Sequence, residues 1–273
     1  MEVSLLGLIL GAVVGLILSL AGAGGGILAV PLLVIGLHLT IMQAAPVGLI
    51  AVGAASAFGA VLGLREGLVR YRAAALIGIT GMLLAPLGVR LARLVPNQPL
   101  MVAFAIMLAW VAWRMFNQAN GSKAAPAEQA AAQMPCVLNP SEGRLIWTMP
   151  CAWALAGTGA VSGVLSGLLG VGGGFVIVPS LTRYTNLAVR SIFATSLAVI
   201  SLVSIGGVTA AAWQGAIAWN IALPFAMGAI VALLAGRLIA ARLASARLQQ
   251  GFAITSAVVS MLLLARGLGL IAA

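Results

Sequence analysis

The longest charge-free stretch of this sequence restricts the environment in which the chain can fold. The 62 residues between Glu2 and Arg65 contain no Asp, Glu, Lys or Arg, and neither do the 38 residues between Arg144 and Arg183. A helix needs about 20 apolar residues to cross the hydrocarbon core of a bilayer. Each stretch therefore holds more than one membrane segment. Only 7% of the chain is charged, against about 25% in soluble domains. The predicted fold class is an all-α polytopic membrane protein.

A cluster of glycines interrupts these apolar stretches twice, at 22–26 and again at 170–174, and a proline follows each cluster at Pro31 and Pro179. Glycine weakens a helix, and lipid cannot satisfy the backbone groups that a broken helix exposes. The apolar segment 27–37 that follows the first cluster would be about 16 Å long as a helix, too short to cross the bilayer core. We interpret each cluster as the tip of a helical hairpin that enters the membrane and turns back.

The two clusters belong to an internal repeat with an offset of 174 − 26 = 148 residues. Residues 11–111 align with residues 159–259 without a gap and share 26 identities in 101 positions, where roughly one in ten is expected by chance, so duplication is the better explanation. The domain prediction is a first membrane repeat at 1–117, a polar linker at 118–145 and a second membrane repeat at 146–273. Each repeat comprises a glycine-tipped hairpin and three transmembrane helices, which gives 8–10 membrane segments in all.

The basic residues predict that the two repeats have opposite orientations. The loop 65–72 carries three arginines and its counterpart 213–220 carries none, whereas the loop 183–190 carries two and its counterpart 38–44 none. The positive-inside rule then places loops 65–72, 183–190 and 242–247 and the linker in the cytoplasm, with both termini outside a bacterial-type inner membrane. Arg90, Arg93 and Arg266 fall on the outer side, where we expect them to snorkel from helix ends.

The predicted site lies where the two glycine tips meet. The free N–H groups at the start of each short arm would favour an anion. All four acidic residues of the chain lie in loops or at the terminus, which argues against a cation substrate. Alternatively, the glycines only allow close helix packing, and the hydroxyls only bond to their own helix. The candidate substrate-binding residues are Gly24, Gly25, Gly26, Gly172, Gly173, Gly174, Thr195, Ser196, Ser56 and Ser204, with Pro31 and Pro179 as structural residues.

Other chemistries find little support in the sequence. The net charge of +10 is explained by loop arginines, and without a basic cluster interleaved with aromatics no nucleic-acid partner is expected. No nucleophile–base pair or metal-ligand pattern is present, so no enzyme activity, cofactor or metal is predicted. Cys136 and Cys151 are interpreted as incidental and not disulfide-bonded. The expected partners are a small anion and the lipid bilayer. The oligomeric state stays open, with a homodimer as one candidate.

The chain resembles the sulfite exporter TauE/SafE family of membrane permeases. The resemblance rests on both glycine clusters with their prolines, on Ala194-Thr195-Ser196 and on the segment 215–219; the first half has Pro46-Val47-Gly48 where the second has Ala-Thr-Ser. It implies export of sulfite, a related sulfur oxyanion or an organosulfonate by a secondary transporter, whereas the residues themselves indicate a small anion. Alternating access is the expected mechanism. The alternatives are an anion channel or facilitator, and a membrane assembly subunit that transports nothing.

Overall fold

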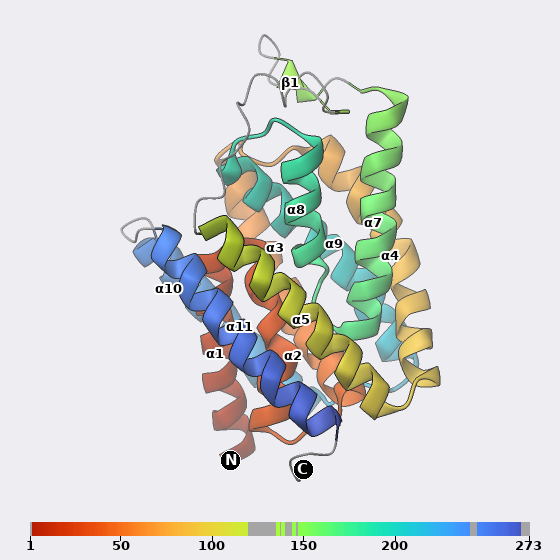
Figure 1. Ribbon diagram of the computed structural model, residues 1–273, viewed down its shortest axis with the longest axis vertical. Coiled ribbons are helices and arrows are strands. Elements are labelled where there is room, and N and C mark those ends of the chain that lie inside the picture. The colour runs from red at the N-terminus through yellow and green to blue at the C-terminus, as the bar shows by residue number, and fades with distance from the viewer. Residues whose placement is uncertain are drawn as a thin grey trace.

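The structure is a computed structural model that describes residues 2–119, 135–136, 138–139, 144–145, 147–240 and 245–268. Helices make up nearly all of this part of the chain, and several of them run along its long axis (Figure 1). The all-α polytopic fold class is therefore confirmed. Most of the predicted linker, and part of the predicted loop 242–247, lie outside the described residues.

The first half contains a hairpin and three long helices, the composition that the sequence predicts for a repeat. The elements are α1 (Glu2–Ala21), the 3-10 helix η1 (Gly22–Leu28), α2 (Ala29–Gly36), α3 (Ile41–Arg65), α4 (Tyr71–Leu94) and α5 (Asn97–Ala119). Two-residue strands β1 (Leu138–Asn139) and β2 (Arg144–Leu145) pair antiparallel between the halves.

The second half repeats this order. Its elements are α7 (Met149–Leu169), α8 (Gly174–Tyr184), α9 (Val189–Trp213), α10 (Trp219–Ala240) and α11 (Ser245–Gly267). Helices α3 and α9 have the same length and both of their ends are offset by 148 residues; α5 and α11 also match at both ends. The offset found in the sequence therefore also sets the boundaries of the secondary structure.

Five of the described helices are long and apolar enough to cross a membrane. They are α3, α4, α7, α9 and the segment Trp219–Gly236 of α10; shorter apolar helices span Ser4–Leu20, Gly25–Gly36 and Ile254–Gly267. The arms α2 and α8 have 8 and 11 residues, about 12 and 16 Å at 1.5 Å per residue, so neither can cross a ~30 Å core. Short arms were expected from the sequence.

Helices from the two halves pair with each other. Helix α1 packs along α10, α4 along α7, α3 along α9 and α5 along α11, and α5 and α11 lie diagonally across the front of the molecule (Figure 1). The glycines make equivalent contacts in both halves. A side chain at Gly15 would collide with the carbonyl oxygen of Ala229, and one at Gly163 would collide with the carbonyl oxygen of Gly81, which is the residue equivalent to Ala229. Small residues let these backbones approach closely.

The two hairpin tips meet inside this bundle. A β-carbon at Gly26 would lie 3.3 Å from the carbonyl oxygen of Val171 in the second tip, and one at Gly48 of α3 would lie 3.2 Å from the carbonyl oxygen of Gly170. Val171 and Gly170 are buried, as is Gly26. The interior around the tips is therefore formed jointly by both halves.

The prediction that the cysteines are unpaired is wrong. Cys136 and Cys151 form a disulfide across 15 residues of sequence. Cys136 also donates its backbone N–H to the carbonyl oxygen of Tyr184, and it forms a β-bridge with Thr185. These contacts hold the end of the linker over the start of α7. The spacing of the cysteines contains no sign of this folding back, which depends on where α8 ends.

Candidate functional site

The second glycine tip is held in a conformation that demands glycine. Gly173 caps the N-terminus of α8 with φ 72° and ψ 2°, in the left-handed region. A β-carbon there would also collide with the side chain of Ser162. Helix α8 begins at Gly174 and no side chain caps it. The N–H of Val176 donates to the carbonyl oxygen of Gly173, whereas those of Gly174 and Phe175 have no acceptor within the helix. Buried N–H groups and a positive dipole end suit an anion.

Buried hydroxyls surround this tip and have no hydrogen-bond partner among the described residues. Ser162 of α7, which faces Gly173, is one, and Ser204 of α9 is another. Ser204 lies between Gly172 of the tip and Gly53 of α3, whose β-carbon would sit 2.9 Å from its Oγ. Both serines are at most 3% exposed. A buried hydroxyl without a partner is costly, so two of them beside free N–H groups form a polar centre suited to a bound group.

The other predicted hydroxyls lie at different positions. Ser56 and Ser196 are fully buried and also without a described partner. Thr195 accepts a hydrogen bond of 3.0 Å from the backbone N–H of Arg70. Helix α9 begins at Val189, so Thr195 lies in its second turn. The structure places Ser204 beside the second tip, whereas the hydroxyl of Thr195 forms a hydrogen bond between the two halves.

The first tip is built differently. Residues Gly22–Leu28, which include Gly24, form a 3-10 helix, whereas the second tip has left-handed glycines at Gly170, Gly172 and Gly173. Gly25 packs against the backbone of Ile17 and Leu18, and Gly26 packs against Val52. The first tip therefore serves close packing in this structure, while the second one has the free helix start and the orphaned hydroxyls.

The two prolines also occupy different positions in their arms. Pro31 is buried in the first turn of α2, where a missing N–H costs little, and Pro179 lies in the second turn of α8, where the helix loses one hydrogen bond. Both follow the tip by the same interval, so each stiffens an arm close to its start.

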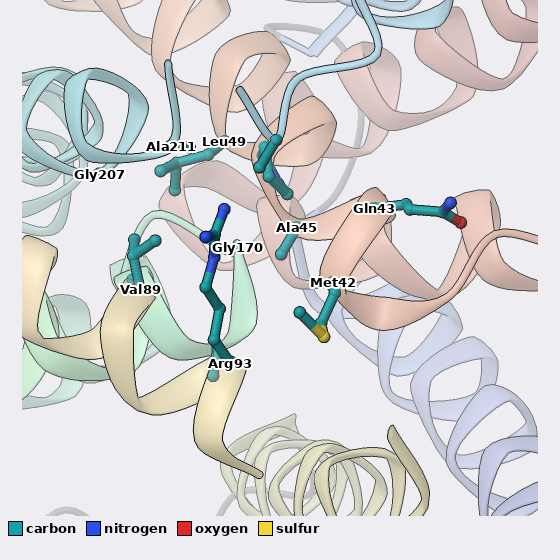
Figure 2. Close-up of a pocket in the computed structure, with 13 residues that line it drawn as sticks. Met42, Gln43, Ala45, Leu49, Val89, Arg93, Gly170, Gly207 and Ala211 are labelled. Carbon is teal, nitrogen blue, oxygen red and sulfur yellow. The ribbon is translucent and has the colours of Figure 1, made fainter. Parts of the chain in front are cut away.

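A pocket of about 170 Å³ leads toward the second tip. A water molecule in the liquid occupies about 30 Å³, so the space can hold a small anion. Gly170 of the tip lies on its wall, and Figure 2 shows Arg93 directed toward this glycine. The lining residues are Met42, Gln43, Ala45, Pro46, Leu49, Val89, Ala92, Arg93, Gly167, Gly170, Gly207, Ala211 and Ala216.

Two residues of this region were not predicted as site residues. Ser162 stands one helical turn before Ser166, which precedes the tip, so the i, i+4 spacing was a usable signal. Arg93, which was expected to snorkel from a helix end, is exposed in the last turn of α4 and also lines the pocket. Only the way α4 packs against α7 and α9 places it there. Among the described residues, no group of His, Cys, Asp or Glu could hold a metal ion.

Known proteins match nearly the whole chain. A family model described as "Sulfite exporter TauE/SafE" matches residues 7–263. A protein of Xylella fastidiosa strain 9a5c named "Probable membrane transporter protein" is 29% identical over 87% of this chain and 85% of its own length. A protein of the same name from strain Temecula1 is 30% identical with the same coverage of both chains. No solved structure gives a significant match.

Proposed function

The chain belongs to the sulfite exporter TauE/SafE family of membrane transporters, and on that premise we propose that it is a secondary transporter that exports a small anion by alternating access. Sulfite is the first candidate substrate, followed by related sulfur oxyanions and organosulfonates. The observation that carries the proposal is an asymmetry between two equivalent regions of the molecule. On one side a pocket reaches the second tip; on the other side the equivalent residues are in contact.

The closed side is sealed by polar and apolar contacts between α9 and the segment that follows α3. The hydroxyl of Ser191 donates to the carbonyl oxygen of Leu68 at 2.5 Å. One turn further along α9, Ala194 packs closely against Gly63 of α3. A β-carbon at Gly63 would lie 3.0 Å from the β-carbon of Ala194. Together with the bond from Arg70 to Thr195, these contacts join the two halves on this side.

On the open side, the residues at the equivalent positions line the pocket. Gln43 and Ala216 correspond to Ser191 and Leu68 through the offset of 148 residues, and all four lie at matching points of α3, α9 and their loops. Pro46 and Ala211, the counterparts of Ala194 and Gly63, also line the pocket. One repeat is therefore open where the other is closed. Exchange of these two arrangements would move access from one face of the membrane to the other.

An inverted repeat is part of the proposal. The pairing of α1 with α10 and of α4 with α7, with equivalent glycine contacts, is what a two-fold relation between the halves produces. The orientation follows from charge: Arg65, Arg70 and Arg72 lie at the end that we assign to the cytoplasm. Figure 1 has the start of α1 and the end of α11 at the opposite end from β1. The pocket is lined near the start of α3 and the end of α4, away from these arginines, so in this orientation it opens outside an inner membrane.

The anion specificity rests on the polar centre at the second tip. The free N–H groups at the start of α8 and the hydroxyls of Ser162 and Ser204 can all donate to an oxyanion. No aspartate exists in the chain, and neither Glu2 nor Glu66, the two glutamates among the described residues, falls within a helix long enough to cross. A cation would therefore meet no carboxylate near the tips. Without such a group, export would follow the membrane potential, worth ~2.3 kcal/mol per charge per 100 mV.

The test is uptake by liposomes containing the purified protein. Sulfite, thiosulfate, sulfate and sulfoacetate would be offered separately, with potassium as a cation control and protein-free liposomes as the blank. We expect saturable uptake of at least one sulfur anion and counterflow exchange when the liposomes are preloaded. Uptake of potassium alone would overturn the anion assignment. Uptake without saturation or counterflow would identify a channel, and no uptake of any solute would favour an assembly subunit.

A further inference from the structure

Arg93 lies at the opening of the pocket and its side chain enters it. Figure 2 shows the guanidinium between Val89, Ala211 and Leu49, directed toward Gly170 of the second tip. Gln43 is the other polar residue of the lining, and Figure 2 shows its amide pointing away from the pocket. The carbonyl oxygen of that amide accepts from the backbone N–H of Thr40 in a capping box. Arg93 is thus the polar side chain that faces the pocket space.

We propose that Arg93 forms an anion-binding subsite in the vestibule and selects the charge of the substrate before it reaches the glycine tip. The inference rests on the proposed transport of an anion and deepens it, because it assigns recognition of the charge to a residue outside the tips. The ligand class is a small oxyanion, bound by the guanidinium through its N–H groups.

The surroundings of Arg93 strengthen its attraction for an anion. Apart from Gln43, the rest of the lining consists of alanine, glycine, proline and larger apolar side chains, with no acidic residue. Arg93 is itself exposed, and a cleft with one sign of charge and apolar walls concentrates counter-ions. No carboxylate in the lining neutralises the guanidinium. An anion in the pocket is therefore favoured and a cation is repelled.

The guanidinium is also oriented for this role. Its Nη2 donates to the backbone carbonyl oxygen of Gln214 at 3.3 Å, which anchors one edge of the group to the loop after α9. The other edge keeps N–H donors in a planar fork, the geometry that binds oxyanions through two parallel hydrogen bonds. Because a carbonyl oxygen accepts without adding charge, the anchoring does not reduce the attraction for an anion.

The repeat provides a contrast in sequence. The residue equivalent to Arg93 in the second half is Ala241, so the duplication does not repeat this arginine. The subsite belongs to the pocket side only. We therefore expect a change at Arg93 to weaken anion binding from the face of the termini, where the pocket opens.

Arg90 provides a matched control. It lies one turn before Arg93 on α4, is likewise an exposed arginine, and is absent from the pocket lining. Three variants would be compared with the parent: Arg93→Gln, Arg93→Lys and Arg90→Gln. A loss of charged hydrogen bonds predicts that Arg93→Gln raises the KM for the transported anion of the panel by about tenfold or more. The KM of Arg93→Lys should lie between those of the parent and Arg93→Gln, and the KM of Arg90→Gln should equal that of the parent.

A second readout works without transport. Ala216, which lines the pocket, would be replaced by cysteine (Ala216→Cys) and labelled with an anionic and with a cationic methanethiosulfonate reagent. The anionic reagent should react faster, and Arg93→Gln should reduce the ratio of the two rates by about tenfold, whereas Arg90→Gln should leave it unchanged. Labelling at a normal total yield shows that the variant is folded with its pocket open.

The outcomes separate this inference from the proposed function. A parent protein that moves no anion overturns the proposed function, and the labelling ratio then decides about Arg93 alone. A parent that transports, with an Arg93→Gln variant that keeps both its KM and its labelling ratio, overturns the role of Arg93. An equal effect of Arg90→Gln would also overturn it, because general surface charge would then explain the attraction.

Discussion

The side chain of Thr195 accepts a hydrogen bond from the backbone N–H of Arg70, a residue 125 positions earlier in the sequence. The bond joins α9 of the second half to the loop after α3 of the first, beside the bond from Ser191 to Leu68. The corresponding positions of the other face are Val47 and Ala218, which cannot form it through side chains. The side-chain hydrogen bond of this face therefore has no equivalent at the pocket side.

We expect a cross-link across the closed face to stop transport. The pair Ser191→Cys and Leu68→Cys, made in a background with Cys136→Ser and Cys151→Ser, should form a disulfide on oxidation because the two residues are already in contact. If this face must open in each cycle, oxidation abolishes uptake and a reductant restores it. The measurement is liposome uptake before and after oxidation.

The control for this experiment is the background protein without the new pair, treated with the same oxidant and reductant. It should transport equally in both states. Full transport by the completely cross-linked protein would show that the Ser191–Leu68 contact is a static link and would remove alternating access through this face.

Gly173→Ala should lower both stability and transport. The residue has a positive φ and its β-carbon would collide with Ser162; the left-handed conformation alone costs roughly 1–2 kcal/mol. Gly157→Ala, in the same hairpin but with no atom near its β-carbon, should be neutral or stabilising by up to about 1 kcal/mol. Thermal unfolding in detergent and liposome uptake would compare them. Equal behaviour of the two variants would argue against a constrained tip.

Ser162→Ala and Ser204→Ala should reduce transport without reducing stability. Each removes a buried hydroxyl that has no described partner, and the loss of such a group is neutral or stabilising by up to about 2 kcal/mol. A hydroxyl that donates to the anion would raise KM by about tenfold when removed. Uptake kinetics and thermal unfolding, measured on the same preparations, separate an effect on anion binding from an effect on protein stability. Unchanged KM in both variants would assign these serines to packing alone.

The disulfide between Cys136 and Cys151 reports on membrane orientation. Closure of a loop of 15 residues stabilises by about 3 kcal/mol, so Cys151→Ser should lower the Tm of the oxidised purified protein. In cells, a linker on the cytoplasmic face would be kept reduced. We therefore expect both thiols to react with maleimide when cells are lysed directly into the reagent under denaturing conditions, and to be protected after oxidation of the purified protein.

The opposite labelling pattern would have a definite meaning. A bond already formed in living cells would place the linker in an oxidising compartment. The loops with Arg65 and Arg183 would then lie outside, against the positive-inside rule, and the direction of the pocket would be reversed. Cells carrying Cys136→Ser provide the control, since Cys151 should then be labelled in either orientation.

The sequence by itself determined the helices and their repetition. Charge-free stretches of this length can satisfy their backbone only as helices in lipid, and the 148-residue offset set the ends of α3 and α9. The glycine clusters also marked where the helices break. These features are local, because each depends on hydropathy and backbone preference over a few turns, and so they can be read along the chain.

Only the tertiary structure decided which side chains meet. It bonded Thr195 to Arg70, joined Cys136 to Cys151, brought Ser162 against Gly173 and turned Arg93 into the pocket. The two tips also proved unequal, although their sequences are alike. These contacts cross between helices far apart in the chain, and they depend on how the helices rotate and slide when their small residues pack. The hydropathy and charge of the sequence do not specify how each helix is rotated about its axis, because most faces of these helices are apolar.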